Sequence, residues 1–343
     1  MSKKSQGLAL LLAFTFLSRS SAGSDAKTPS PPSATVENAR DESGLLWKEP
    51  TDIRSRNLFY GPGGERDQPH PPFIFVEEDL KGTSPKYVVR DSDGVKWTVK
   101  LGIEARPETV ATRLVWAAGY FTNEDYFLQD LQVNGIAAAH LKRGENLIGP
   151  GGSMHAARLK RHLKNEKKIE DWKWRDEPFA GSRELNGLKV MMALINNWDL
   201  KDDNNGLYAG NEAAGHVYMV SDLGASFGTT GLSFPFSHSK GDLNSFAHSK
   251  FIGKVSTEYV DFRTPSRPAV IYAFWPPLFL GRLRLDGLCH RIPRADARWV
   301  GHLLSGLSPN QIRDAFRAAG YTPEQVDGFS KVIEERITEL NQL

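Results

Sequence analysis

Short apolar runs separated by turn residues dominate the first half of the chain. Residues 73–76 (FIFV), 87–90 (YVVR) and 96–101 (KWTVKL) are rich in aromatic and β-branched side chains, and polar stretches lie between them. This pattern predicts three strands of a small antiparallel sheet. Two later runs, residues 124–133 and 156–160, are interpreted as further strands.

Apolar residues recur at helical spacing in other parts of the chain. One predicted helix begins near Pro107 and ends at Gly119, and another covers residues 184–195. Near the carboxyl end, residues 296–307 have the same spacing. Ser308 and Thr322 are each followed by proline and, three residues on, by glutamine, which is the pattern of a capping box. The sequence therefore predicts a helical hairpin over residues 308–341.

Two polar residues flank a predicted β-hairpin in the middle of the chain. Residues 206–209 (GLYA) and 217–220 (VYMV) are strand-like, and residues 210–215 (GNEAAG) are typical of a turn. Asn204 at the entry and Asp222 at the exit are therefore expected to lie side by side. An amide oxygen and a carboxylate at that distance suit Mg²⁺, which takes only one or two protein carboxylates.

Asp199 and Lys201 precede this hairpin in the spacing D-x-K-x-x-N, which ends at Asn204. Asp199 is placed to accept a proton from an attacking hydroxyl, and Lys201 to lie against a transferring phosphoryl group. These residues with Asp222 are the polar parts of a phosphoryl-transfer site. The alternative is that the Asp-Asp-Asn-Asn run is a solvated turn.

Composition and charge narrow the function classes. The 343 residues are 40% hydrophobic and 24% charged, as in globular proteins, and the net charge is +2 with both signs mixed along the chain. This gives no electrostatic case for nucleic acid as a partner. The densest basic run, residues 158–168, is interpreted as a strand edge followed by a solvated segment, with an anionic substrate as the alternative. The single cysteine, Cys289, is expected to be a small buried residue.

The first 43 residues have the features of a targeting segment and a linker. Lys3 and Lys4 precede an apolar run, residues 7–17, and small residues follow at 20–23. This predicts a secretory signal peptide over residues 1–26, a secreted or periplasmic protein, and no stable membrane span after cleavage. Residues 27–43 are proline-rich, polar and aperiodic, and are predicted to be a disordered linker.

The stretch from Asp199 to Asn204 followed by Asp222-Leu223-Gly224 resembles the catalytic loop and metal-binding motif of the protein-kinase superfamily. Asn197-Trp198 stands where typical protein kinases have His-Arg. An Asn-x-Asp with asparagine five residues after the aspartate is similar to HipA-type kinases and, more loosely, to phosphatidylinositol kinases. Lys201 departs from these two, which usually carry histidine there, and agrees with the protein-kinase pattern.

The resemblance implies an α+β, two-lobed kinase-like fold. Its small antiparallel-sheet N-lobe would cover residues 44–133, and its mainly helical C-lobe residues 134–343. The catalytic loop would be residues 195–224. The crossing between the lobes, where an adenine ring would bind, is expected to follow the strand at 124–133.

The resemblance also implies nucleotide-binding residues in the first lobe. In HipA-type kinases a Gly-x-x-Pro-Lys stretch covers the nucleotide phosphates, and a similar stretch here is Gly82, Thr83, Ser84, Pro85 and Lys86. Lys100 would be the strand lysine that holds the phosphates, paired with a glutamate of the next helix. Glu108 is the first candidate for that glutamate, and Glu104 is the alternative.

These features together predict an ATP- and Mg²⁺-dependent kinase that acts outside the cytoplasm on a hydroxyl acceptor. Asp199 and Lys201 would be catalytic, and Asn204 and Asp222 would bind the metal. Two alternatives stay open: a catalytically inactive protein that binds a nucleotide or a partner, and a nucleotidyl transferase on the same fold. The acceptor and the oligomeric state are beyond what the sequence indicates.

Overall fold

The computed structural model describes residues 44–343, except residues 83, 164–166, 176–177, 210–214, 230–238, 265–284 and 286. The predicted signal peptide and linker lie outside the described residues. Within the described part, no helix has both the length and the apolar character needed to cross a membrane.

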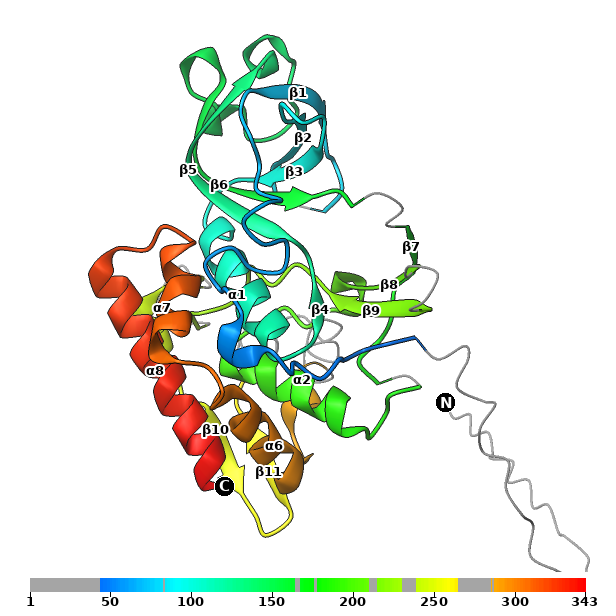
Figure 1. Ribbon diagram of the computed structural model, residues 1–343, viewed down its shortest axis with the longest axis vertical. Helices are drawn as coiled ribbons and strands as arrows, with labels where there is room; N and C mark the ends of the chain where they lie inside the picture. The colour runs from blue at the N-terminus through cyan, green and yellow to red at the C-terminus, as the bar shows by residue number, and fades with distance from the viewer. Residues whose placement is uncertain are drawn as a thin grey trace, which may run out of the picture. The chain divides into compact units, whose positions relative to one another are not determined.

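A five-stranded barrel forms the first lobe (Figure 1). Its strands follow one another in the order β1-β2-β3-β6-β5 around the closed sheet. Their bounds are Phe73–Glu78 for β1, Lys86–Arg90 for β2, Lys96–Lys100 for β3, Asp125–Asn134 for β5 and Ser153–Arg161 for β6. The predicted antiparallel strands are confirmed, and a parallel pairing of β1 with β5 closes them into a barrel.

Alternation along the strands separates the interior of the barrel from its outer face. Inward side chains such as Tyr87, Val89, Trp97, Val99 and Leu159 are at most 1% exposed and fill the interior. The residues between them on β2, β3 and β6 therefore point outward, because successive side chains of a strand alternate in direction. On β3 and β6 these outward residues, Thr98, Lys100, Arg158 and Lys160, are polar and form part of the site described below.

The barrel extends past residue 133, where the sequence analysis ends the first lobe. β6 pairs with β3 on one side and with β5 on the other. The chain therefore leaves the barrel after Arg161, and the crossing expected after residue 133 is corrected to this later position. The pattern of residues 156–160 predicts a strand correctly, but a strand's own pattern does not specify its partners.

Helix α1, Ala105–Ala117, lies beside the barrel and is buried along almost its whole length (Figure 1). It contacts β5, β6 and β4 (Phe121–Thr122) as well as α7 of the second lobe. The predicted helix is confirmed and starts two residues before Pro107. The amino-terminal end of α1 faces the site, so the glutamates there are within reach of β3.

A four-stranded sheet of order β4-β9-β8-β7 lies next to the barrel. β7 is Lys168–Glu170, β8 is Asn205–Ala209 and β9 is His216–Val220, and β8 and β9 form the predicted antiparallel hairpin. A short 3-10 helix, Asp202–Asn204, leads into β8. The ends of this hairpin carry the two candidate metal ligands.

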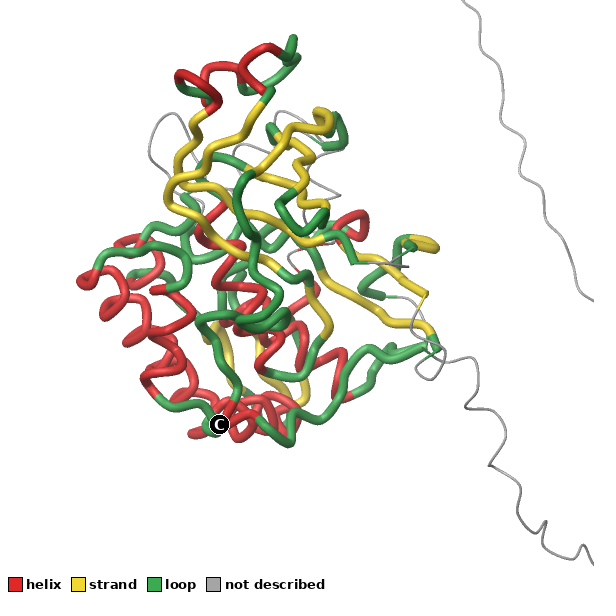
Figure 2. The backbone as a smooth tube through the Cα atoms, turned by 45° about the horizontal axis from the view of Figure 1, so that its top comes forward, coloured by secondary structure: helices red, strands yellow, loops and turns green. Residues whose placement is uncertain are grey.

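The rest of the second lobe is mainly helical (Figures 1 and 2). Its helices are α2 (Arg183–Leu194), α3 (Leu243–Ala247), α6 (Arg294–Leu304), α7 (Pro309–Arg317) and α8 (Pro323–Gln342). A three-stranded sheet of β10 (Ile252–Val255), β11 (Tyr259–Phe262) and β12 (Ile292–Pro293) accompanies them. The described part is thus an α+β fold with a small barrel lobe and a mainly helical lobe.

The predicted helical hairpin at the carboxyl end is confirmed. Ser308 and Thr322 both form complete capping boxes, each with a proline in the first turn of its helix. Phe316 of α7 stacks on Phe329 of α8 with the ring centroids 5.1 Å apart. Cys289 is buried, as expected.

Candidate functional site

A polar cavity of about 500 Å³ brings the candidate site residues together. Nine of the ten residues singled out from the sequence line it, although they come from four separate segments of the chain. The described lining residues are Asp79, Gly82, Ser84, Lys86, Thr98, Lys100, Glu104, Glu108, Asn123, Arg158, Lys160, Asp199, Lys201, Asp203, Asn204, Ser221 and Asp222. The tenth candidate, Thr83, lies outside the described residues.

The register of the barrel places a row of cationic side chains along one wall of this cavity. Lys86 of β2 is paired with Lys100 of β3, and Lys100 is paired with Arg158 of β6. Residues paired across neighbouring strands point to the same face of a sheet. Thr98 and Lys160, also a pair, form the next row along the same strands and line the cavity as well.

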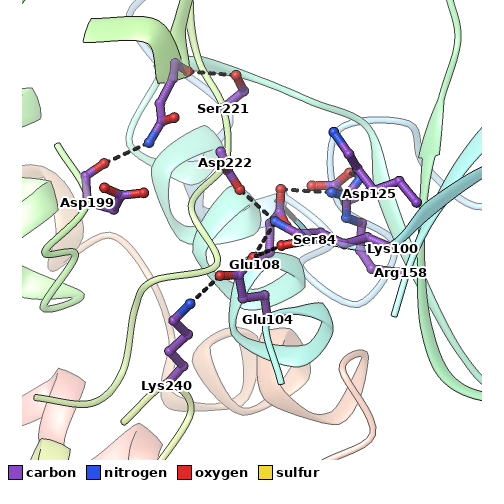
Figure 3. Close-up of polar contacts among 12 residues, drawn as sticks. Ser84, Lys100, Glu104, Glu108, Asp125, Arg158, Asp199, Ser221, Asp222 and Lys240 are labelled. Carbon is purple, nitrogen blue, oxygen red and sulfur yellow. Dashed lines mark hydrogen bonds and ion pairs between the residues drawn. The ribbon is translucent and has the colours of Figure 1, made fainter. Parts of the chain in front are cut away.

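Lys100 lies at the centre of the site (Figure 3). Its Nζ is 2.6 Å from Glu104 Oε2, 3.0 Å from Glu108 Oε2 and 2.6 Å from Asp222 Oδ1, and its side chain is 4% exposed. Burial alone would lower the pKa of the ammonium. Glu108 first, then Asp222 and Glu104, outweigh that effect and raise the pKa of Lys100 well above its usual range.

Both candidate glutamates of α1 bind Lys100. Glu108 is 1% exposed, and its second oxygen accepts a hydrogen bond from Arg158 Nη2 at 3.0 Å. Glu104 is the N-cap residue of α1 and also accepts a hydrogen bond from Lys240 Nζ. Burial would raise the pKa of Glu104, but Lys100 and Lys240 lower it to about 2. The sequence analysis offered Glu108 or Glu104 as the partner of Lys100, and in the structure both form an ion pair with it.

Arg158 was not among the candidates, and the interpretation of the basic run is wrong at this residue. Arg158 is 4% exposed and bridges Glu108 to Asp125 Oδ1, which is 3.4 Å from its Nη1. Burial raises the pKa of Asp125 to about 6 even though Arg158 acts against it. Strand alternation counted back from Lys160 puts Arg158 on the cavity face, so the signal was present in the sequence.

The hairpin brings the two candidate metal ligands to neighbouring ends of β8 and β9. The amide of Ser221 donates to the carbonyl of Asn204 at 3.0 Å, and Ser221 Oγ donates to the same carbonyl at 2.7 Å. Asp222 follows at once in a left-handed conformation, with φ of +54°, and its side chain is 48% exposed. Partial burial would raise the pKa of Asp222, but Lys100 lowers it below its usual value.

Asp199 is held at the edge of the cavity by its own loop. Its amide donates to Asn197 Oδ1 at 2.9 Å, and its carbonyl accepts from Asn204 Nδ2 at 2.8 Å. The side chain is 20% exposed, and Lys201 Nζ is 2.8 Å from Asp199 Oδ1. The D-x-K-x-x-N spacing thus joins its three polar residues in one hydrogen-bonded loop rather than in a loose solvated turn.

The loop with the Gly-x-x-Pro-Lys pattern lies over the amino-terminal end of α1. Gly82 adopts a φ of +67°, a backbone conformation that glycine takes without strain. Ser84 Oγ donates to Glu104 Oε2 at 3.4 Å, and Lys86 Nζ is 3.4 Å from Asp79 Oδ2. The described part of this loop therefore contributes a hydroxyl and an ammonium to the cavity.

The donors present suit a magnesium nucleotide. Asn204 uses its amide nitrogen on the carbonyl of Asp199, which leaves its side-chain oxygen for a cation, and the Asp222 carboxylate, two residues past the end of β9, lines the same cavity. Hard oxygen ligands of this kind match Mg²⁺. A volume of about 500 Å³ is within the usual range for small-molecule sites.

No protein-family model matches this chain, and no curated protein matches it. Several solved structures resemble it weakly, and two of them are kinases. A proinflammatory kinase of Helicobacter pylori, CtkA, gives a TM-score of 0.42 at 11% identity, covering 78% of this chain and 96% of that chain. The golgi casein kinase gives a TM-score of 0.34 at 10% identity, covering 80% and 73% respectively. At these values, function has to be argued from the site of this chain itself.

Proposed function

We propose that this protein is an ATP- and Mg²⁺-dependent phosphotransferase whose acceptor is a hydroxyl group. One observation carries the proposal. Residues chosen for phosphoryl-transfer chemistry from residues 82–86, 100–108, 199–204 and 222 line a single cavity. Four distant segments meeting in this way are difficult to explain by a solvated turn at Asp199.

Each residue has a role that fits its surroundings. Lys100 and Lys86 supply ammonium groups to the phosphates from adjacent strands. Asn204 and Asp222 hold Mg²⁺, which when bound neutralises charge on the transferring phosphoryl group. Asp199, fixed by its own loop, accepts the proton of the acceptor hydroxyl. Lys201, paired with Asp199 in this structure, is placed to lie against the transferring phosphoryl group.

The charge of the cavity supports a requirement for the metal. Among the described residues, five cationic and six anionic side chains line it, so without a cation they provide no excess of positive charge for a nucleoside triphosphate. Binding of the nucleotide should therefore depend on Mg²⁺. Asp222, which binds Lys100 in this structure, would be one of the residues that hold the metal.

The first test is thermal unfolding of the full chain with Mg-ATP, beside Asp222→Ala and Asp199→Asn. A ligand at a hundred times its Kd stabilises the folded state by about 2.7 kcal/mol. We expect a Mg²⁺-dependent shift in the wild type and in Asp199→Asn, and none in Asp222→Ala. The absence of a shift at millimolar Mg-ATP in the wild type would contradict the proposal.

The second part of the test follows the label of radioactive ATP. Transfer of the γ-phosphate to an acceptor, or to water, supports a kinase, whereas incorporation of an α-label indicates nucleotidyl transfer. Nucleotide binding without either reaction indicates an inactive binding protein. Loss of its general base should slow Asp199→Asn about 10²- to 10⁴-fold, and full activity in that variant would remove Asp199 from this role.

The proposed place of action, outside the cytoplasm, rests on residues 1–26 alone. Their basic start and apolar run are typical of a signal peptide. Amino-terminal sequencing of the exported protein should find a start close to Ala22 or Ala26. A chain that retains Met1 and stays inside the cell would contradict this part of the proposal.

A further inference from the structure

Lys240 connects three parts of the site although the sequence gives no reason to select it. Its Nζ binds Glu104 Oε1 at the start of α1 (Figure 3). The same ammonium lies 5.2 Å from the ring centroid of Trp198, the residue before Asp199. The side chain is 16% exposed, so most of its surface is covered by neighbouring residues.

The backbone around Lys240 is fixed on both sides. The amide of Ser239 donates to the carbonyl of Thr229 at 2.9 Å, and the amide of Gly241 donates to that of Ser226 at 2.9 Å. Gly228 passes so close that an added Cβ would lie 2.2 Å from the carbonyl oxygen of Ser239. Lys240 therefore reaches Glu104 from a stretch that is held against residues 226–229.

Lys100 has more acidic partners than a phosphate-binding lysine can keep. An ammonium group has three donors, and Glu104, Glu108 and Asp222 occupy positions within 3.0 Å of it. A phosphate oxygen can bind Lys100 only after at least one of these carboxylates gives up its hydrogen bond to Nζ. The site must therefore contain a way to release Lys100.

The three carboxylates differ in how they can be released. Glu108 is buried and fixed by Arg158 on its other oxygen, so it stays in place. Asp222 has an alternative partner in the proposed metal. Glu104 has an alternative partner in Lys240, and Gly224 lies directly against it, since a Cβ there would be 2.7 Å from Glu104 Cβ.

We propose that Lys240 is a positioning residue that takes up the charge of Glu104 and so leaves Lys100 available to the nucleotide phosphates. This inference rests on the proposed function. It makes Lys240 a competitor of Lys100 for one carboxylate, and not a ligand of the nucleotide. Removal of Lys240 should therefore weaken nucleotide binding through Glu104.

The test compares the Kd of Mg-ATP in the full-length wild type, Lys240→Met, Glu104→Gln and the double variant. Methionine keeps the aliphatic stem over Trp198 and removes the charge. We expect Lys240→Met to weaken binding about tenfold, and Lys240→Arg to keep the wild-type value. Glu104→Gln should bind at least as tightly as the wild type. The double variant should return to within about threefold of the wild type.

The rescue by Glu104→Gln separates this role from simple packing. If Lys240 merely holds residues 239–242 against residues 226–229, the double variant will bind as weakly as Lys240→Met, and the inference is overturned. An unchanged Kd in Lys240→Met overturns it as well. If the wild type binds no Mg-ATP, the proposed function fails first, and that result is distinct from both.

A second readout needs no nucleotide. Chemical unfolding of the same four proteins gives the coupling between Lys240 and Glu104 by a double-mutant cycle. The matched control is Lys331 with Glu335, an exposed pair 3.9 Å apart on α8, for which coupling should be close to zero. Coupling between Lys240 and Glu104 no larger than in this control would contradict the competition for Glu104.

Discussion

Two arginines, Arg158 in the first lobe and Arg336 in the second, are buried to a similar degree but held by different partners. Arg158 is 4% exposed and lies between the carboxylates of Glu108 and Asp125. Arg336 is 2% exposed and donates to backbone carbonyls, an amide and a hydroxyl, among them Leu194 O at 2.7 Å and Ser249 Oγ at 2.8 Å. Negative charges compensate the guanidinium of Arg158, whereas uncharged hydrogen-bond acceptors solvate the guanidinium of Arg336.

The difference appears in the pKa values of the two groups. Burial would lower the pKa of Arg158, but Glu108 and then Asp125 raise it. Burial lowers the pKa of Arg336 to about 10, and Glu339 offsets only part of that effect. Carboxylates thus keep Arg158 charged, whereas Arg336 uses its N–H groups to bind the backbone carbonyls of residues such as Leu194 and Ser249. Arg158 therefore supports the charged groups of the cavity, whereas Arg336 holds the backbone of the loop that precedes Asp199.

The loop that leads to Asp199 depends on Arg336 through Asn196. Arg336 Nη1 donates to Asn196 Oδ1 at 3.1 Å, and Asn196 Nδ2 donates to the carbonyl of Gly228 at 2.9 Å. Asn196 has a φ of +52°, an unusual conformation for a residue with a side chain. These bonds hold it in place three residues before Asp199.

The largest effect is expected from Arg336→Met. This change leaves several buried acceptors without a donor, each of which costs about 1–3 kcal/mol. We expect a loss of about 4 kcal/mol in the free energy of unfolding, measured in urea at pH 5 and at pH 8. Because the hydrogen-bond acceptors of Arg336 do not titrate, their part of the loss should be the same at both pH values. Glu339, whose pKa burial raises, adds a smaller part that depends on pH. A strong difference between the two pH values would show that Arg336, like Arg158, acts mainly through charge.

The fold was predictable wherever local pattern decides it. The β8–β9 hairpin, the strands β1 to β3 and both capping boxes follow from neighbouring residues, and all are confirmed. The closure of the barrel was not predictable in the same way. It depends on which strands pair, and the alternation in residues 156–160 is compatible with more than one neighbour.

The candidate site shows the same division. Lys100, Asp199, Asn204 and Asp222 belong to motifs with recognisable spacing, and the structure brings them to one cavity. Asp125 and Lys240 belong to no motif, because their importance comes only from what they meet in space. The sequence around Asp125 does not indicate whether its carboxylate is buried or exposed. Their contribution becomes visible only with the fold.

A smaller and pH-dependent effect is expected from Arg158→Met, and it sharpens the comparison with Arg336. The carboxyl of Asp125 already has a pKa of about 6 because of burial, and without Arg158 that pKa rises further. A folded carboxyl that keeps its proton to a higher pH than the unfolded one makes stability fall as the pH rises through that window. At pH 8 the variant must bury an ionised Asp125 without its partner, at a cost of about 3 kcal/mol. At pH 5 the carboxyl of Asp125 is protonated, and the cost should be clearly smaller.

Unfolding in urea at both pH values measures the difference, with Arg158→Lys as the charge-conserving control. Equal losses at pH 5 and pH 8 would show that Arg158, like Arg336, acts through its hydrogen bonds and not through charge.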